Sequence, residues 1–88
     1  MRFEVRAANL AFNTTHLHVR AGTQVTAVFQ NDDASVPHNL SFNVPGLEHG
    51  ETCTGPCTVS QTFTAPAPGR YQFFCTIHPM VGDFIVDP

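Results

Sequence analysis

The segment Cys75-Thr76-Ile77-His78-Pro79-Met80-Val81-Gly82 places a thiol, an imidazole and a thioether within six positions. A second imidazole stands far upstream, at His38. Two imidazoles, a thiolate and a weakly held thioether are the donor set of a type 1 copper site. The sequence therefore predicts one copper ion, cycling between Cu(I) and Cu(II), with His38, Cys75, His78 and Met80 as its ligands.

Apolar and polar residues alternate along most of the remaining chain, as is typical of strands. Phe3 and Val5 alternate with charged neighbours, and Val25, Ala27 and Phe29 alternate with mostly polar ones. Turn residues separate such runs roughly every ten positions, and no helix of normal length is indicated. We predict an all-β fold, namely a Greek-key β-sandwich of about seven to eight strands.

This strand pattern also places the candidate ligands. Cys75 shares the parity of the aromatic residues that precede it, so its side chain is expected to point inward at the end of a strand. His38 shares the parity of Leu40 and Phe42, and is expected to begin a strand with its ring toward the core. Residues 44–57 are rich in Gly, Pro and Cys and are interpreted as a loop.

Pro79 separates His78 from Met80 by a single residue. Proline fixes its own φ and favours an extended conformation for the residue before it. In an extended segment, residues two apart point to the same side. We therefore expect the side chains of His78 and Met80 to face one ion.

Composition limits the remaining possibilities. The chain has 88 residues, of which 42% are hydrophobic and 12% charged, and it contains no lysine. This length predicts a single domain over residues 1–88. We expect the protein to be a monomer. The net charge of -3 and the lack of a basic patch argue against a nucleic-acid partner. No apolar run approaches the ~20 residues that span a bilayer.

Three cysteines suggest one disulfide and one functional thiol. Cys53 and Cys57 lie close enough in sequence to pair, while Cys75 stands apart. Three reduced thiols, or a redox-active dithiol at Cys53 and Cys57, are the alternatives. A disulfide favours a periplasmic or other extracytoplasmic location. Because Met1-Arg2-Phe3-Glu4 leads directly into a strand pattern, we expect either a cytoplasmic chain or one whose export signal or membrane anchor lies outside this sequence.

Pro37-His38-Asn39 and the segment 75–82 together resemble the cupredoxins, the plastocyanin and amicyanin group of small blue copper proteins. The turn at 65–69, Ala-Pro-Ala-Pro-Gly, followed by aromatic residues at 71 and 73 and the cysteine at 75, is typical of bacterial members. The resemblance covers nearly the whole chain. It implies a β-sandwich of eight strands or slightly fewer, one copper ion, and electron transfer, usually outside the cytoplasm.

Position by position, the resemblance implies equatorial ligands at His38, Cys75 and His78, with Met80 nearest to the axial ligand. The departure is the spacing after His78, where amicyanin-like sequences have two residues before the methionine. Asn39 resembles the family residue whose hydrogen bonds tie the first ligand strand to the cysteine loop.

The function predicted is that of a one-electron carrier between redox proteins, and not of an enzyme. A redox partner is expected to dock over His78, beside an apolar patch. That patch comprises Pro45, Leu47, Pro79, Met80 and Val81.

Two other copper functions remain open, copper storage or delivery and a domain of a larger copper oxidase. An oxidase needs several His-x-His pairs, and only His16-Leu17-His18 is present. No role is expected for His16, His18 or His49. Zinc would accept the same four ligands, and a Cys75–His78 hydrolase would lack a visible oxyanion loop.

Overall fold

The computed structural model describes residues 1–88 and contains ten strands and no helix. One sheet has the order β2-β1-β4-β8, and the other has the order β3-β10-β9-β6. The strands of the first sheet are β1 (Arg2–Ala8), β2 (Ala11–Phe12), β4 (Gln24–Asn31) and β8 (Cys57–Thr64). Those of the second are β3 (His16–Arg20), β6 (Ser41–Phe42), β9 (Gly69–Phe74) and β10 (Val81–Asp87). A short separate ribbon pairs β5 (Pro37–His38) with β7 (Cys53–Thr54).

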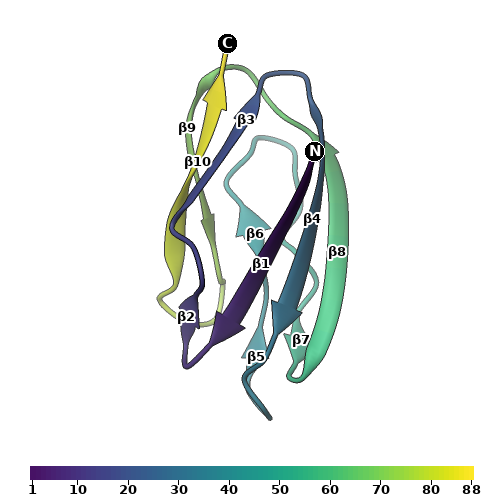
Figure 1. Ribbon diagram of the computed structural model, residues 1–88, viewed down its shortest axis with the longest axis vertical. Coiled ribbons are helices and arrows are strands. Elements are labelled where there is room, and N and C mark those ends of the chain that lie inside the picture. Colours follow the sequence, from purple (N-terminus) through teal and green to yellow (C-terminus); the bar gives the residue numbers. More distant parts are fainter.

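The two sheets form the layers of a sandwich, as Figure 1 shows. The chain passes from one sheet to the other between β2 and β3, between β3 and β4, and between β8 and β9, and twice more through the β5–β7 ribbon, from β4 to β6 and from β6 to β8. These crossings create two parallel pairs, β1 with β4 and β3 with β10. The predicted all-β sandwich is therefore confirmed. None of the chain's elements is a helix long and apolar enough to cross a membrane.

Aromatic rings fill the space between the sheets. Phe42 lies at the centre, with its ring centroid 4.9 Å from that of Phe63 and 5.1 Å from that of Phe84. Tilted and edge-to-face contacts of this kind stabilise cores beyond the area that they bury. The apolar residues of the alternating runs, such as Val5 and Phe29, point into this core and are almost fully buried.

The predicted strand from His38 to Phe42 differs in the structure. It is divided into β5 and β6, and every residue from 38 to 42 is buried. Parity therefore does not separate an inner from an outer face here. Part of the predicted loop 44–57 is also ordered as a strand, because Cys53 pairs with His38 across the β5–β7 ribbon.

This ribbon lies at the lower end of the sandwich in Figure 1, away from the C-terminus. The connection between β9 and β10 turns at the same end, because β10 runs from there to the C-terminus. Two segments far apart in sequence, around His38 and around Cys75, are thereby brought together.

Candidate metal centre

His38, Cys75 and His78 converge, with one potential ligand atom from each lying within 4.8 Å of the others. The Sγ atom of Cys75 is 3.9 Å from Nδ1 of His38. The two imidazole centroids are 4.8 Å apart, with an angle of 70° between the rings. His38 and Cys75 are buried, whereas His78 is half-buried. The sequence thus predicted correctly that these three side chains come together.

The backbone on each side fixes these donors. His38 ends β5 and is held in register with Cys53 of β7. Cys75 directly follows β9, and its N–H donates to the carbonyl oxygen of Met80, 3.1 Å away. This bond closes the connection from 75 to 80 into a compact loop. The donor set is consequently held by the fold rather than assembled by the metal.

Met80 is buried, with 4% of its surface exposed. Its N–H donates to the carbonyl oxygen of His78 at 2.8 Å, which makes a three-residue turn centred on Pro79. The expected extended conformation is therefore replaced by a tight turn, whose φ suits proline. Since Met80 is buried, it is not part of the exposed apolar patch predicted around His78.

The Nδ1 atom of His78 is buried and has no hydrogen-bond partner. Buried polar atoms are nearly always paired, and an unpaired one needs a physical explanation. A metal ligand is such an explanation, because a neutral imidazole nitrogen donates its lone pair to the ion. The orphaned atom belongs to the same cluster as a thiol and a second imidazole. The residues present therefore fit a bound soft or borderline metal ion.

The environment of Cys75 favours its thiolate. Burial raises the pKa of the Cys75 thiol, but hydrogen bonds from the backbone N–H groups of Asn39, Ile77 and His78 lower it by more, so the net direction is downward. A thiolate is the form that binds metals. The sulfur is thus prepared as a ligand by backbone hydrogen bonds.

Asn39 joins the two ligand segments, as predicted. Its Nδ2 donates to Oγ1 of Thr76 at 2.6 Å and to Oγ1 of Thr52 at 3.0 Å. Its Oδ1 accepts from the backbone N–H of Thr76 at 3.1 Å and from the hydroxyl of Ser41 at 3.0 Å. Thr76 follows Cys75, so these bonds fix the cysteine loop against the His38 segment.

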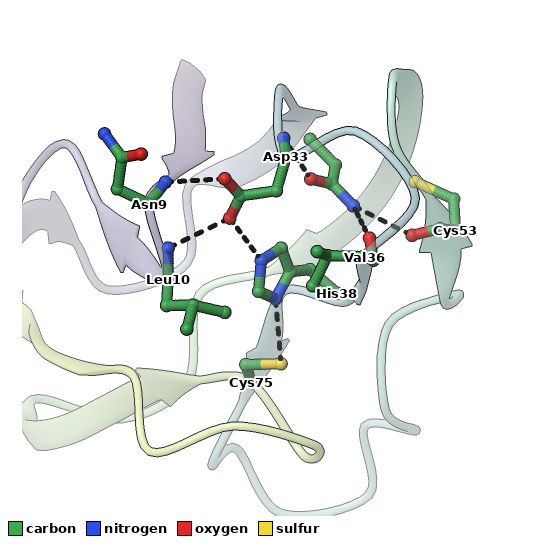
Figure 2. A network of polar contacts seen from close by, with 8 residues as sticks. Asn9, Leu10, Asp33, Val36, His38, Cys53 and Cys75 are labelled. Atoms are coloured by element: carbon green, nitrogen blue, oxygen red, sulfur yellow. Dashed lines mark hydrogen bonds and ion pairs between the residues drawn. The ribbon is translucent and has the colours of Figure 1, made fainter.

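Two residues behind His38, Asp33 and Asn31, were not predicted from the sequence. Figure 2 shows the Asp33 carboxylate beside the His38 ring, with Oδ2 2.7 Å from Nε2. Asn31 is fully buried and donates to the carbonyl oxygens of Val36 and Cys53. In the sequence, both residues belong to the polar run Asn31-Asp32-Asp33, which indicates only the end of a strand. An acidic side chain five residues before a ligand histidine was the one available signal, and it is not specific.

Cys53 and Cys57 form a disulfide, which leaves Cys75 as the free thiol. His16 and His18 are exposed and lie near the carboxylates of β10 rather than near the cluster.

Comparison with known proteins supports the interpretation of the His38, Cys75 and His78 cluster as a metal site. The family described as "Cupredoxin-like domain" matches residues 1–86. Amicyanin-alpha of Methylorubrum extorquens is 38% identical over 96% of this chain and 71% of its own length. Amicyanin of Paracoccus denitrificans is 36% identical over 94% of this chain and 63% of its own length, so the chain spans somewhat under two thirds of that relative.

Solved structures agree with the sequence relatives. Auracyanin A, described as a "blue" copper protein from Chloroflexus aurantiacus, superposes with a TM-score of 0.84. The two are 27% identical, over 99% of this chain and 98% of the other. The ligand cluster, the sandwich and these matches lead to one conclusion: the chain belongs to the cupredoxin-like family.

Proposed function

We propose that this protein is a type 1 copper protein that carries one electron at a time between redox partners. The observation that carries the proposal is the convergence of His38, Cys75 and His78, with an orphaned Nδ1 on His78. These three side chains would hold the ion, and buried Met80 would supply the axial thioether. With copper bound, such a site supplies reversible one-electron chemistry between Cu(I) and Cu(II).

The protein's contribution is to keep the ligands in place. Hydrogen bonds from Asn39 and the turn at Pro79 restrain the cysteine loop, and the β5–β7 ribbon restrains His38. Ligands that need not move when the charge of the ion changes keep the reorganisation accompanying electron transfer small. The amicyanin and auracyanin relatives support this reading over an enzymatic one.

The partner would dock over His78, the one ligand imidazole that is half-buried rather than buried. Apolar side chains surround this position, including Ile77 and Val81, which are 46% and 54% exposed. A hollow formed by Leu10, Phe12, Pro79 and neighbouring residues adjoins them. An apolar, mostly uncharged surface of this kind fits a transient protein partner. The Cys53–Cys57 disulfide supports an extracytoplasmic location.

An absorption spectrum tests the copper assignment. The protein loaded with Cu(II) is expected to show an intense visible thiolate-to-copper charge-transfer band. Cys75→Ser should abolish the band, whereas His18→Ala, which changes an exposed histidine outside the cluster, should retain it. A wild-type protein that binds the ion without such a band would overturn the proposal, and a preference for zinc with no coloured copper form would do the same.

Met80→Leu tests the axial ligand separately. The exchange nearly conserves volume, so the buried site should tolerate it at a cost below about 1.5 kcal/mol. If Met80 binds, losing the thioether should raise the reduction potential and change the ratio of the charge-transfer bands, because the axial ligand tunes both. An unchanged potential and spectrum would show that Met80 is not a ligand.

A further inference from the structure

The ring of His38 lies between the sulfur of Cys75 and the carboxylate of Asp33. On one side, Nδ1 faces the sulfur of Cys75 at 3.9 Å, within the ligand cluster. On the other side, Nε2 is 2.7 Å from Oδ2 of Asp33. The side chain of His38 is fully buried, and that of Asp33 is 13% exposed. The carboxylate therefore acts on the ring at short range, with little water between or around them.

Asp33 is itself held by a turn from a distant part of the chain. Its Oδ1 accepts from the N–H of Asn9 at 2.6 Å, and its Oδ2 accepts from the N–H of Leu10 at 3.0 Å, as Figure 2 shows. Asn9 and Leu10 have φ values of 53° and 61°, in the left-handed region that side chains other than glycine rarely adopt. Two consecutive residues in this conformation aim both N–H groups at one carboxylate. The hairpin that joins β1 to β2 explains this conformation, because Asn9 and Leu10 are its two loop residues and such loops favour positive φ at both positions.

These contacts settle the protonation pattern of the pair. Both carboxylate oxygens of Asp33 already accept backbone N–H groups, Oδ1 from Asn9 and Oδ2 from Leu10, and this geometry suits the ionised, acceptor-only form. An ionised carboxylate only accepts hydrogen bonds, so Nε2 of His38 must carry the proton. The lone pair is then on Nδ1, which is the nitrogen directed at the cluster.

The other ligand imidazole has no such support. The ring of His78 makes no hydrogen bond to another protein group, and its Nδ1 is the buried atom without a partner. The two histidines are thus unequal. His38 is hydrogen-bonded to a fixed carboxylate, whereas His78 has no such bond and can contact a partner protein.

On these grounds we propose that Asp33 is a positioning residue for the metal, which fixes the tautomer of His38 and lowers the reduction potential of the site. The inference rests on the proposed copper function. A carboxylate bonded to the remote nitrogen orients a ligand imidazole and makes it a stronger base. A stronger base and a nearby negative charge both favour the more positive, oxidised ion.

The experiment compares two substitutions that remove one negative charge each, at adjacent residues. Asp33→Asn removes the charge bonded to His38. Asp32→Asn is the matched control, because Asp32 instead contacts Gln30 and Arg6. Voltammetry of the copper-loaded proteins is expected to show a clear upward shift of the midpoint potential for Asp33→Asn and a much smaller one for Asp32→Asn. Asp33→Glu, which keeps the charge, should shift the potential less than Asp33→Asn.

A second measurement does not depend on copper or on a variant. Long-range ¹H–¹⁵N NMR spectra of the metal-free wild-type protein at neutral pH are expected to show His38 with its proton on Nε2. Finding the proton on Nδ1 would overturn the proposal even if Asp33→Asn failed to fold.

Equal shifts for the two asparagine variants would also overturn it, because a general loss of charge would then explain the potential. Failure of the copper function would look different, since the wild-type protein would lack the visible band while His38 kept its tautomer.

Discussion

Replacing Asn39 by alanine would cut the link between the two ligand segments. Asn39 is 1% exposed, and its side chain takes part in four hydrogen bonds. Alanine can form none of them, and it leaves a space between the segment at His38 and the loop that begins at Cys75. The fold should therefore lose stability even without a metal.

The structure sets the size of the loss. Ser41 is fully buried, so its hydroxyl loses an acceptor that water cannot easily replace, which costs about 1–3 kcal/mol. The other three bonds end on Thr52 and Thr76, which are exposed, so each contributes near the lower limit of about 0.5 kcal/mol. We expect the free energy of unfolding to fall by about 2.5–4.5 kcal/mol, a large share of the ~5–10 kcal/mol that a domain of this size has.

Urea unfolding of the metal-free protein, followed by circular dichroism, measures this loss. Asn43→Ala is the matched control, because Asn43 is exposed and its side chain makes no hydrogen bond within the protein. A change at such a position usually stays within about 0.5 kcal/mol. If Asn39→Ala lost no more stability than Asn43→Ala, the role of the Asn39 hydrogen bonds would be refuted.

Two further predictions concern the second sheet. Gly82→Ala would place a Cβ atom within the space occupied by the ring of Phe73. Urea unfolding should therefore show a loss of stability typical of overpacking, about 1–3 kcal/mol. A variant as stable as the wild type would contradict this tight fit. Arg70 donates to Asp83 at 2.8 Å and lowers the pKa of that carboxyl. A carboxyl whose pKa falls on folding stabilises the fold above its unfolded pKa, and this effect is lost as the pH falls through the folded value. Arg70→Gln should therefore slightly reduce stability at neutral pH and leave it unchanged near about pH 2, and a deficit that persists in acid would argue against this linkage.

Local patterns predicted the strands and the loop that carries Cys75 and His78, because both depend on short-range order. The alternation around Val5 and Phe29 corresponds to buried faces of β1 and β4. Cys75 and His78 stay close together in the structure, because both lie in the loop between the paired strands β9 and β10. The pairing of Cys53 with His38 was missed, because a segment rich in Gly and Pro becomes a strand only when a distant partner is present.

The support for His38 could not be predicted for the same reason. Asp33 reaches Asn9 and Leu10 across 24 and 23 positions, through a hairpin loop whose positive φ is rare for a residue such as Leu10. His38 and its neighbours up to Phe42 are all buried, so period-2 alternation carries no information there. Polar networks of this kind are determined by tertiary contacts, which a single sequence does not display.

The crowding of candidate donors into one loop has a consequence for metal uptake during folding. Cys75, His78 and Met80 lie within six residues, so the unfolded chain already presents three potential ligands close together. His38 joins them only when β5 and β7 have paired. Copper would therefore bind both the unfolded and the folded chain. It would stabilise the fold only by the difference between its affinities for these two states. The dependence of the unfolding midpoint on copper concentration would measure that difference, which is the share of the affinity contributed by His38 and by burial of the site.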